Sequence, residues 1–193
     1  MIYTTQYDSP IGSIVMAGDG ESLTGLWFAC QKYFGSTLPG GEKVAWSHEW
    51  STEGLPEVCS GDLPKVREYS PETSQLPIFQ TTKRWLDLYF HGEIPDFTPT
   101  LRLIGTPFRN AVWEILLTIP YGRTMTYGEI ASKLAEQRGL PRMSAQAVGG
   151  AVGHNPISII VPCHRVLGSD GSLTGYAGGV EKKAALLALE QPK

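Results

Sequence analysis

Hydrophobic and β-branched residues gather in three short runs near the start of the chain, at residues 2–7, 13–17 and 23–28. Polar segments that contain glycine separate these runs. Short β-prone runs divided by turn residues are typical of consecutive antiparallel strands. The pattern therefore predicts a three-strand antiparallel sheet at this end of the chain.

A helical pattern follows a stretch that has no clear periodicity. Residues 31–75 are rich in Gly, Pro, Ser and Glu, and we expect loops with one short helix there. Over residues 76–91, apolar and small residues recur at helical spacing until Gly92 ends the pattern: Phe79, Thr82, Leu86 and Tyr89. This spacing predicts a helix that covers one face of the sheet.

Three helices are predicted in the second half of the chain. Thr106 and Pro107 form an N-cap and a first helical position, and the apolar stripe behind them stops at residue 119. Thr126 and Glu129 have the spacing of a capping box. The third helix, residues 144–153, consists almost entirely of small residues. Short helices joined by short connections predict a helix-turn-helix.

The last part of the chain is predicted to contain two short strands and a closing helix. The apolar run 157–161 indicates an extended segment that leads to Cys163, and residues 173–176 indicate a second one. Residues 180–190 have a helical pattern, with an apolar face of Val180, Ala184 and Leu187.

Charge divides the chain into two parts. Residues 1–100 hold six Lys and Arg against 13 Asp and Glu, whereas residues 101–193 hold ten against six. The division falls in a segment rich in proline and glycine, residues 93–106, which is typical of a linker. We expect an N-terminal domain over 1–98 and a C-terminal domain over 99–193, whose basic character favours a polyanion such as DNA.

Composition favours a protein without a disulfide framework. The chain has three cysteines, an odd number at no zinc-like spacing, so we expect at least one free thiol. No run of 18 apolar residues occurs and no leader pattern follows Met1. We therefore expect a cytoplasmic protein that does not interact with membranes.

Cys163 and His164 are adjacent, and a cysteine beside a base is a candidate nucleophile. A buried cysteine that serves only in packing is the alternative. Glu190 also has two interpretations, because the helix macrodipole opposes a carboxylate at a helix C-terminus. It lies either in water on a frayed end or beside a specific cationic or proton-donating partner. The glycines of residues 144–153 indicate close approach either of a neighbouring segment or of a nucleic-acid backbone.

These residues together resemble the methylated-DNA–protein-cysteine methyltransferase family. The resemblance is carried by Val161 to Val166 (VPCHRV), Ala147 to Ala151 (AVGGA), Asn155-Pro156, Gly175-Tyr176 and Gly178-Gly179. It is specific over residues 106–190 and weaker in the first half. It implies a ribonuclease-H-like α/β N-terminal domain and a winged-helix-like C-terminal domain. The latter would bind the minor groove and flip the damaged base into a pocket.

The resemblance also implies a role for each catalytic residue. Cys163 corresponds to the alkyl acceptor, and His164 to the base that activates it through a water molecule. Glu190 corresponds to the carboxylate that orients the histidine. Asn155 corresponds to an asparagine that holds the turn, and Tyr127 to a tyrosine that contacts the flipped nucleotide and can donate a hydrogen bond to the leaving purine.

Further positions correspond to contacts with the substrate or with DNA. The carbonyls of Cys163 and Val166 and the amide of Ala177 would read the guanine edge. Gln146 stands where the family usually has an arginine that fills the gap left by the flipped base. We expect Gln146 to fill this gap and Arg142 to contact phosphate. The remaining expected contacts are Ala147, Gly149, Gly150, Arg165, Tyr176 and Gly178.

The implied reaction uses no cofactor, because the protein itself accepts the alkyl group. The partner is double-stranded DNA that contains O6-alkylguanine, with O4-alkylthymine as a second substrate to test. Each molecule is expected to act once, as a monomer. A non-catalytic sensor of alkyl lesions is an alternative that Cys163 argues against. An unrelated cysteine hydrolase is another, and it predicts multiple turnovers.

Overall fold

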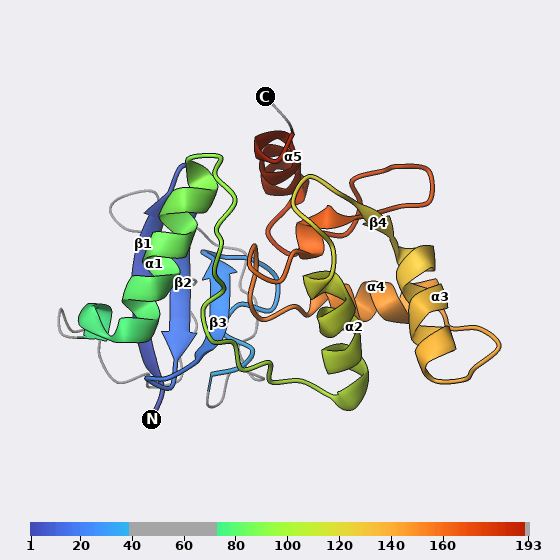
Figure 1. Ribbon diagram of the computed structural model, residues 1–193, viewed down its shortest axis with the longest axis horizontal. Helices are drawn as coiled ribbons and strands as arrows, with labels where there is room; N and C mark the ends of the chain where they lie inside the picture. The colour runs from blue at the N-terminus through green and yellow to red at the C-terminus, as the bar shows by residue number, and fades with distance from the viewer. Residues whose placement is uncertain (39–72, 192–193) are drawn as a thin grey trace. The chain divides into compact units, whose positions relative to one another are not determined.

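The structure, a computed structural model, describes residues 1–38 and 73–191 (Figure 1). It divides into two compact units, Met1–Leu103 and Ile104–Lys193. The division lies within the linker segment 93–106, later than the expected limit at residue 98. Residues 100–102 belong to the first unit because Leu23 N donates to Thr100 O at 2.8 Å and Arg102 N donates to Leu23 O at 2.9 Å.

The first unit contains the expected three-strand antiparallel sheet. Its strands are β1 (Tyr3–Ser9), β2 (Gly12–Gly18) and β3 (Leu23–Phe28), in that order across the sheet. Tyr7 pairs with Ile14, and Val15 pairs with Trp27. Every residue of β3 is buried. Within 31–75, where one short helix was expected, the structure describes residues 31–38 and 73–75, and Thr73–Gln75 forms a 3-10 turn. The rest of this expectation lies outside the described residues.

Helix α1 (Pro77–Phe90) covers one face of this sheet (Figure 1). Proline occupies its first turn, where a missing N–H costs nothing. Phe79, Leu86 and Tyr89 are fully buried, as their spacing predicts. Tyr7 Oη donates a hydrogen bond to Asp87 Oδ1 at 2.8 Å, which ties β1 to the helix.

The second unit contains the three predicted helices, α2 (Pro107–Leu117), α3 (Tyr127–Gln137) and α4 (Ala145–Gly153). Thr106 and Ser144 cap α2 and α4 through their hydroxyls, and the Thr126–Glu129 capping box is formed at α3. Trp113 Nε1 donates to Ala151 O at 2.8 Å, which joins α2 to α4 in the core.

A small parallel pair of strands and a final helix complete the second unit. Strand β4 (Met125–Thr126) pairs with β5 (Val166–Leu167), and α5 spans Val180–Leu189. The predicted strand at residues 173–176 is wrong, because that segment forms no strand. The predicted face of α5 is also wrong. Its buried residues are Lys183 and Leu186, whereas Val180 is 50% exposed.

Candidate active site

Cys163 opens a single turn of 3-10 helix, Cys163–Arg165. The predicted extended segment over residues 157–161 is therefore wrong. This buried run is folded into turns, and Ile159 has a φ of 69°. The left-handed conformation is uncommon for a β-branched residue, so the surrounding contacts must hold it.

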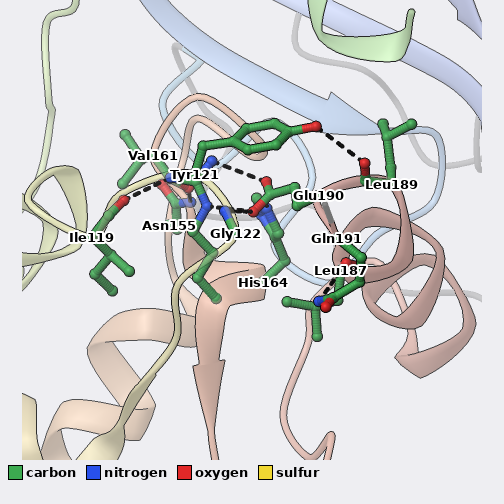
Figure 2. Close-up of polar contacts among 11 residues, drawn as sticks. Ile119, Tyr121, Gly122, Asn155, Val161, His164, Leu187, Leu189, Glu190 and Gln191 are labelled. Carbon is green, nitrogen blue, oxygen red and sulfur yellow. Dashed lines mark hydrogen bonds and ion pairs between the residues drawn. The ribbon is translucent and has the colours of Figure 1, made fainter. Parts of the chain in front are cut away.

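The side chain of Asn155 binds the backbone on either side of Ile159. Its Oδ1 accepts a hydrogen bond from Ile157 N at 3.1 Å. Its Nδ2 donates to Val161 O at 2.7 Å (Figure 2). The same Nδ2 lies 3.0 Å from Cys163 Sγ. One buried amide thus fixes the backbone ahead of the cysteine and also contacts its sulfur.

Cys163 is buried, and burial raises the pKa of its thiol to about 11. The Asn155 side chain, the charge of Lys183 and the backbone amides of Cys163 and His164 act in the opposite direction, because each of them favours the thiolate. At neutral pH the sulfur is protonated, so it needs a base before it can attack.

His164 is fully buried beside a carboxylate. Its Nε2 lies 2.7 Å from Glu190 Oε1. Since an ionised carboxylate only accepts hydrogen bonds, Nε2 carries the hydrogen and Nδ1 is the nitrogen that can take up a proton. Burial lowers the pKa of His164 and outweighs the opposing effect of Glu190. The imidazole is therefore neutral and able to act as a base.

Four donors surround the Glu190 carboxylate. Besides His164, Arg165 donates from Nε to Oε2 at 2.8 Å and from Nη2 to Oε1 at 2.9 Å, and Gly122 N donates to Oε2 at 3.1 Å (Figure 2). Burial alone raises the pKa of Glu190, but the bonds from His164 and Arg165 outweigh it and bring the pKa to about 2. Glu190 is 2% exposed, which excludes the frayed helix end in water.

Arg165, expected to contact DNA, is part of this buried network. Its Nη1 donates to Ile119 O at 2.6 Å, and its guanidinium lies 5.7 Å from the centre of the Tyr121 ring. The carboxylate of Glu190 and this carbonyl occupy the three nitrogens of the guanidinium. A contact with DNA does not fit these surroundings, and Arg165 instead neutralises Glu190.

Tyr127, the first residue of α3, lies beside the cysteine segment because β4 pairs with β5. Its hydroxyl donates to Thr174 O at 3.0 Å. A Cβ at Gly175, whose φ is 76°, would lie 2.8 Å from this hydroxyl, so the close approach requires glycine. Burial and the nearby Cys163 raise the pKa of Tyr127, which keeps its proton in place at neutral pH.

The other expected pocket residues lie around the same turn. Tyr176 is buried, and it is close enough to Cys163 for the thiolate to raise its pKa beyond the effect of burial. Ala177 and Gly178 are half-buried in a turn. The Val166 carbonyl, expected to read guanine, already accepts a hydrogen bond from Lys183 Nζ at 2.6 Å. A carbonyl has two lone pairs, so this bond leaves one for a ligand.

The outer side of α4 and its preceding loop carries the expected DNA contacts. Arg142, Gln146, Ala147 and Gly150 are exposed. A Cβ at Gly150 would meet no described atom within 4 Å, whereas one at Gly149 would make ordinary contact with the Tyr127 ring. Packing within the described chain therefore does not explain Gly150, and close approach of an external partner remains as its explanation.

Lys183 is a residue of the site that the sequence prediction missed. It is fully buried on α5, and its Nζ also donates to Thr174 O at 2.8 Å. Lys183, Leu186 and Glu190 recur at helical spacing, which marks them as one face of the helix. That spacing is present in the sequence, but Val180, Ala184 and Leu187 form a competing apolar face.

Residues 1–38 and 73–191 contain no cluster of three or more His, Cys, Asp or Glu side chains that could hold a metal ion. Within the same ranges, no helix has the length and hydrophobicity needed to cross a bilayer.

Known proteins are similar to this chain in both sequence and architecture. Residues 107–192 match the family model described as the DNA-binding domain of 6-O-methylguanine DNA methyltransferase. The methylated-DNA–protein-cysteine methyltransferase of Mycobacterium leprae is 42% identical over 191 residues, which are 99% of this chain and 93% of the relative.

Two crystal structures of a Mycobacterium tuberculosis relative agree with this match. The O6-methylguanine methyltransferase of that organism has a TM-score of 0.69 at 40% identity, with 99% of this chain and 93% of the other covered. The same organism's OGT in complex with DNA has a TM-score of 0.68 at 41% identity, over 98% and 92% of the two chains. The chain with the buried Cys163, His164 and Glu190 therefore belongs to the methylated-DNA–protein-cysteine methyltransferase family.

Proposed function

We propose that the protein repairs alkylated double-stranded DNA by moving the methyl group from O6 of guanine to Sγ of Cys163. The observation that carries this proposal is a buried Cys163 whose sulfur lies 3.0 Å from the donor Asn155 Nδ2 and whose neighbour in the chain, His164, is paired with Glu190 at 2.7 Å. Named relatives with the same activity, one of them solved with DNA, support it.

The transfer begins with removal of the thiol proton. A neutral His164, held by Glu190 with Nδ1 as its basic nitrogen, takes this proton through one water molecule. The sulfur then attacks the methyl carbon, the S–C bond forms and the C–O6 bond breaks. Its electron pair stays on the guanine.

The leaving guanine needs a proton, and Tyr127 is the proposed donor. Its pKa is raised, so its hydroxyl is protonated at the start. The hydrogen that it donates to Thr174 O in this structure turns to the guanine in the proposed step, because a donor at the developing charge lowers the barrier. The proton held by His164 then restores the tyrosine. In sum, the thiol hydrogen and the methyl group change places between protein and DNA.

The reaction is expected to stop after one event on each molecule. The product is a thioether, which is a poor leaving group, and no other group of the mechanism removes the methyl. We therefore infer a stoichiometric reaction. An unrelated cysteine hydrolase would turn over many times, and a sensor of alkyl lesions would bind without transfer.

We infer that α4 approaches the minor groove and that the target base is flipped toward Cys163. The exposed face with Gly150 and Ala147 allows close approach, and flipping costs a few kcal/mol, less for a damaged base that pairs poorly. Gln146 would fill the gap and Arg142 would contact phosphate. Glutamine lacks the charge and stacking plane of arginine, so Gln146→Arg should raise affinity for duplex DNA.

Counting the transferred groups tests the proposal. Labelled methyl is followed from an O6-methylguanine duplex in excess over the protein, and transfer should stop at one methyl group per protein molecule. Gln146→Ala should slow the reaction on duplex DNA, while on a single strand, where no stack must be filled, its rate should match the parent. Continued release of methyl would indicate a hydrolase, and no transfer would indicate a sensor. A parallel duplex with O4-methylthymine measures the second substrate.

A further inference from the structure

We propose that Tyr121 is a positioning residue of the transfer reaction, whose ring covers the Arg165–Glu190 ion pair and thereby keeps His164 a neutral base. This inference rests on the proposed function and names a residue that the mechanism above does not use. Tyr121 acts through Arg165 and Glu190 and not on the reacting atoms themselves.

The hydroxyl of Tyr121 fixes the position of its ring. It donates a hydrogen bond to Leu189 O at 3.1 Å, and Figure 2 shows the hydroxyl pointing to this residue. Leu189 is the last residue of α5, and the last carbonyls of a helix have no partner within the helix. The bond therefore satisfies a carbonyl at the helix end and ties the ring to the segment that carries Glu190.

The ring of Tyr121 lies against the ion pair. Its centre is 5.7 Å from the Arg165 guanidinium, within the roughly 6 Å of a cation–π contact. The neighbours of Tyr121 in the chain bind the same pair. Ile119 O accepts a hydrogen bond from Arg165 at 2.6 Å, and Gly122 N donates one to Glu190 at 3.1 Å. Only 10% of the Arg165 side chain and 1% of the Glu190 side chain are exposed beside this turn.

The ring is close enough to respond to both charges of the pair. Burial raises the pKa of Tyr121, the Glu190 carboxylate raises it further, and Arg165 acts in the opposite direction. Tyr121 is therefore neutral at neutral pH and covers the pair without adding a charge. An ion pair weakens when water reaches it, because water screens the two charges. Removal of the ring should therefore weaken the bond between Arg165 and Glu190.

This ion pair controls the basicity of His164. Glu190 Oε1 accepts hydrogen bonds from both His164 Nε2 and Arg165 Nη2, at 2.7 Å and 2.9 Å. The charged groups that act on His164 are Arg165 in its own turn and Glu190 and Lys183 on α5. Burial lowers the pKa of His164 most, Glu190 raises it, and the two cations lower it. Water admitted beside Arg165 would reduce both its effect and that of burial, so the pKa of His164 would rise.

Two substitutions separate the ring of Tyr121 from its hydroxyl. Tyr121→Leu removes both, whereas Tyr121→Phe keeps the ring. The measurement is the single-turnover rate of methyl transfer from an O6-methylguanine duplex, at saturating protein, as a function of pH. The acid limb is the pH range in which the rate falls as His164 takes up a proton. We expect this limb to lie about half a pH unit or more higher in Tyr121→Leu, or about threefold in rate on the limb, with equal rates above it. Tyr121→Phe should keep the limb of the parent.

Two further measurements separate this role from losses of stability and of activity. Ile115→Val removes one buried methylene group from α2 without changing any group of the ion pair, and Ile115 is 4% exposed. This variant should unfold at a lower temperature and keep the acid limb of the parent. The titration of the His164 imidazole, followed by NMR, requires no methyl transfer. Its midpoint should move to higher pH in Tyr121→Leu.

An acid limb that stays in place in Tyr121→Leu, or that moves equally in Tyr121→Phe or Ile115→Val, would overturn the inference. If Tyr121→Leu does not fold, the unsubstituted protein is measured at low and at high salt. A covered ion pair is screened little by salt, so the acid limb should stay in place, and a limb that moves with salt would overturn the inference. If the unsubstituted protein transfers no methyl group, the proposed function fails, while the His164 titration still tests the role of Tyr121.

Discussion

His164 Nε2 and Glu190 Oε1 lie 2.7 Å apart, and both side chains are buried. The two hydrogen bonds from Arg165 neutralise the charge of the Glu190 carboxylate. The group of Arg165, Glu190 and His164 therefore has no net charge while the imidazole is neutral. A compensated carboxylate orients the imidazole without strongly raising its basicity. The site can therefore hold a neutral base in the interior, ready for the thiol proton.

The acid stability of the protein should depend on Glu190. Its pKa of about 2 in the folded state lies below the value of about 4.3 for an unfolded chain. A depressed pKa gives stability that is complete above the unfolded value and is lost as pH falls toward the folded one. We expect this carboxylate to contribute about 2–3 kcal/mol that disappears between about pH 4.5 and pH 2.

Glu190→Gln tests this dependence. The variant should be less stable at neutral pH by about 3–5 kcal/mol, because Arg165 is left buried without a counter-ion. Its free energy of unfolding, measured in urea at a series of pH values, should change less than that of the parent in the acid range. If the free energy of unfolding fell equally in the parent and in Glu190→Gln over the acid range, Glu190 would not be the source of the acid dependence.

Gly122 should be required for the position of the Glu190 segment. Its φ is 70°, and a Cβ there would lie 2.8 Å from Glu190 O. Gly139 has a similar φ of 62° but no described atom within 4 Å of the corresponding Cβ. Both alanine variants incur the backbone cost of about 1 kcal/mol, and only Gly122→Ala adds a collision.

The difference between the two variants isolates the contact with Glu190. We expect Gly122→Ala to lose stability and to transfer methyl more slowly, whereas Gly139→Ala should lose only a little stability. The measurements are chemical unfolding and the single-turnover rate. If both substitutions lowered stability and transfer rate equally, the close approach of Gly122 to Glu190 would not be needed for the site.

Asn155 should contribute to reactivity as well as to folding. Asn155→Asp keeps the oxygen that accepts from Ile157 N but replaces the donor beside Cys163 Sγ with a carboxylate oxygen. A negative charge there raises the pKa of the thiol. We expect the transfer rate at neutral pH to fall by more than tenfold, about one pKa unit, with partial recovery at high pH. If the transfer rate of Asn155→Asp fell only as far as its loss of stability explains and did not recover at high pH, Asn155 would not stabilise the thiolate of Cys163.

Gly150 should favour DNA binding at the expense of stability. Alanine in a helix interior is more stable than glycine by about 0.8–1 kcal/mol, and a Cβ at Gly150 meets no described atom within 4 Å. Gly150→Ala should therefore unfold at a higher temperature. Its affinity for an O6-methylguanine duplex, measured by fluorescence anisotropy in a Cys163→Ser background, should fall about tenfold, or about 1.4 kcal/mol. Unchanged affinity would show that DNA does not approach α4 at this residue.

The helices were predictable from sequence because their determinants are local. Thr106, Ser144 and the Thr126–Glu129 box each act within four residues of the helix start. The strands of the first unit were predictable for the same reason, because they follow from short apolar runs separated by turn residues. The family resemblance predicted that Glu190 orients His164, and these two side chains are in contact although the residues lie 26 positions apart in the chain.

The errors came from interactions that span many residues. The turn before Cys163 depends on Asn155, whose amide binds Val161 and Cys163, and an apolar run gives no indication of it. The expected contact of Arg165 with DNA is wrong because its partner, Glu190, lies 25 residues away in the chain. The buried face of α5 was misassigned because Lys183 is apolar only in its stem, and its partners are carbonyls from two other segments.

The most direct test of the account is the intact mass of the protein after incubation with O6-methylguanine duplex DNA, followed by peptide mapping. We predict a gain of one CH2 unit, located on Cys163, that is absent in Cys163→Ser and retained in Cys30→Ser. Cys30 is the other cysteine among the described residues and is the matched control. An unmodified Cys163, or a methyl group on another residue, would contradict the central claim.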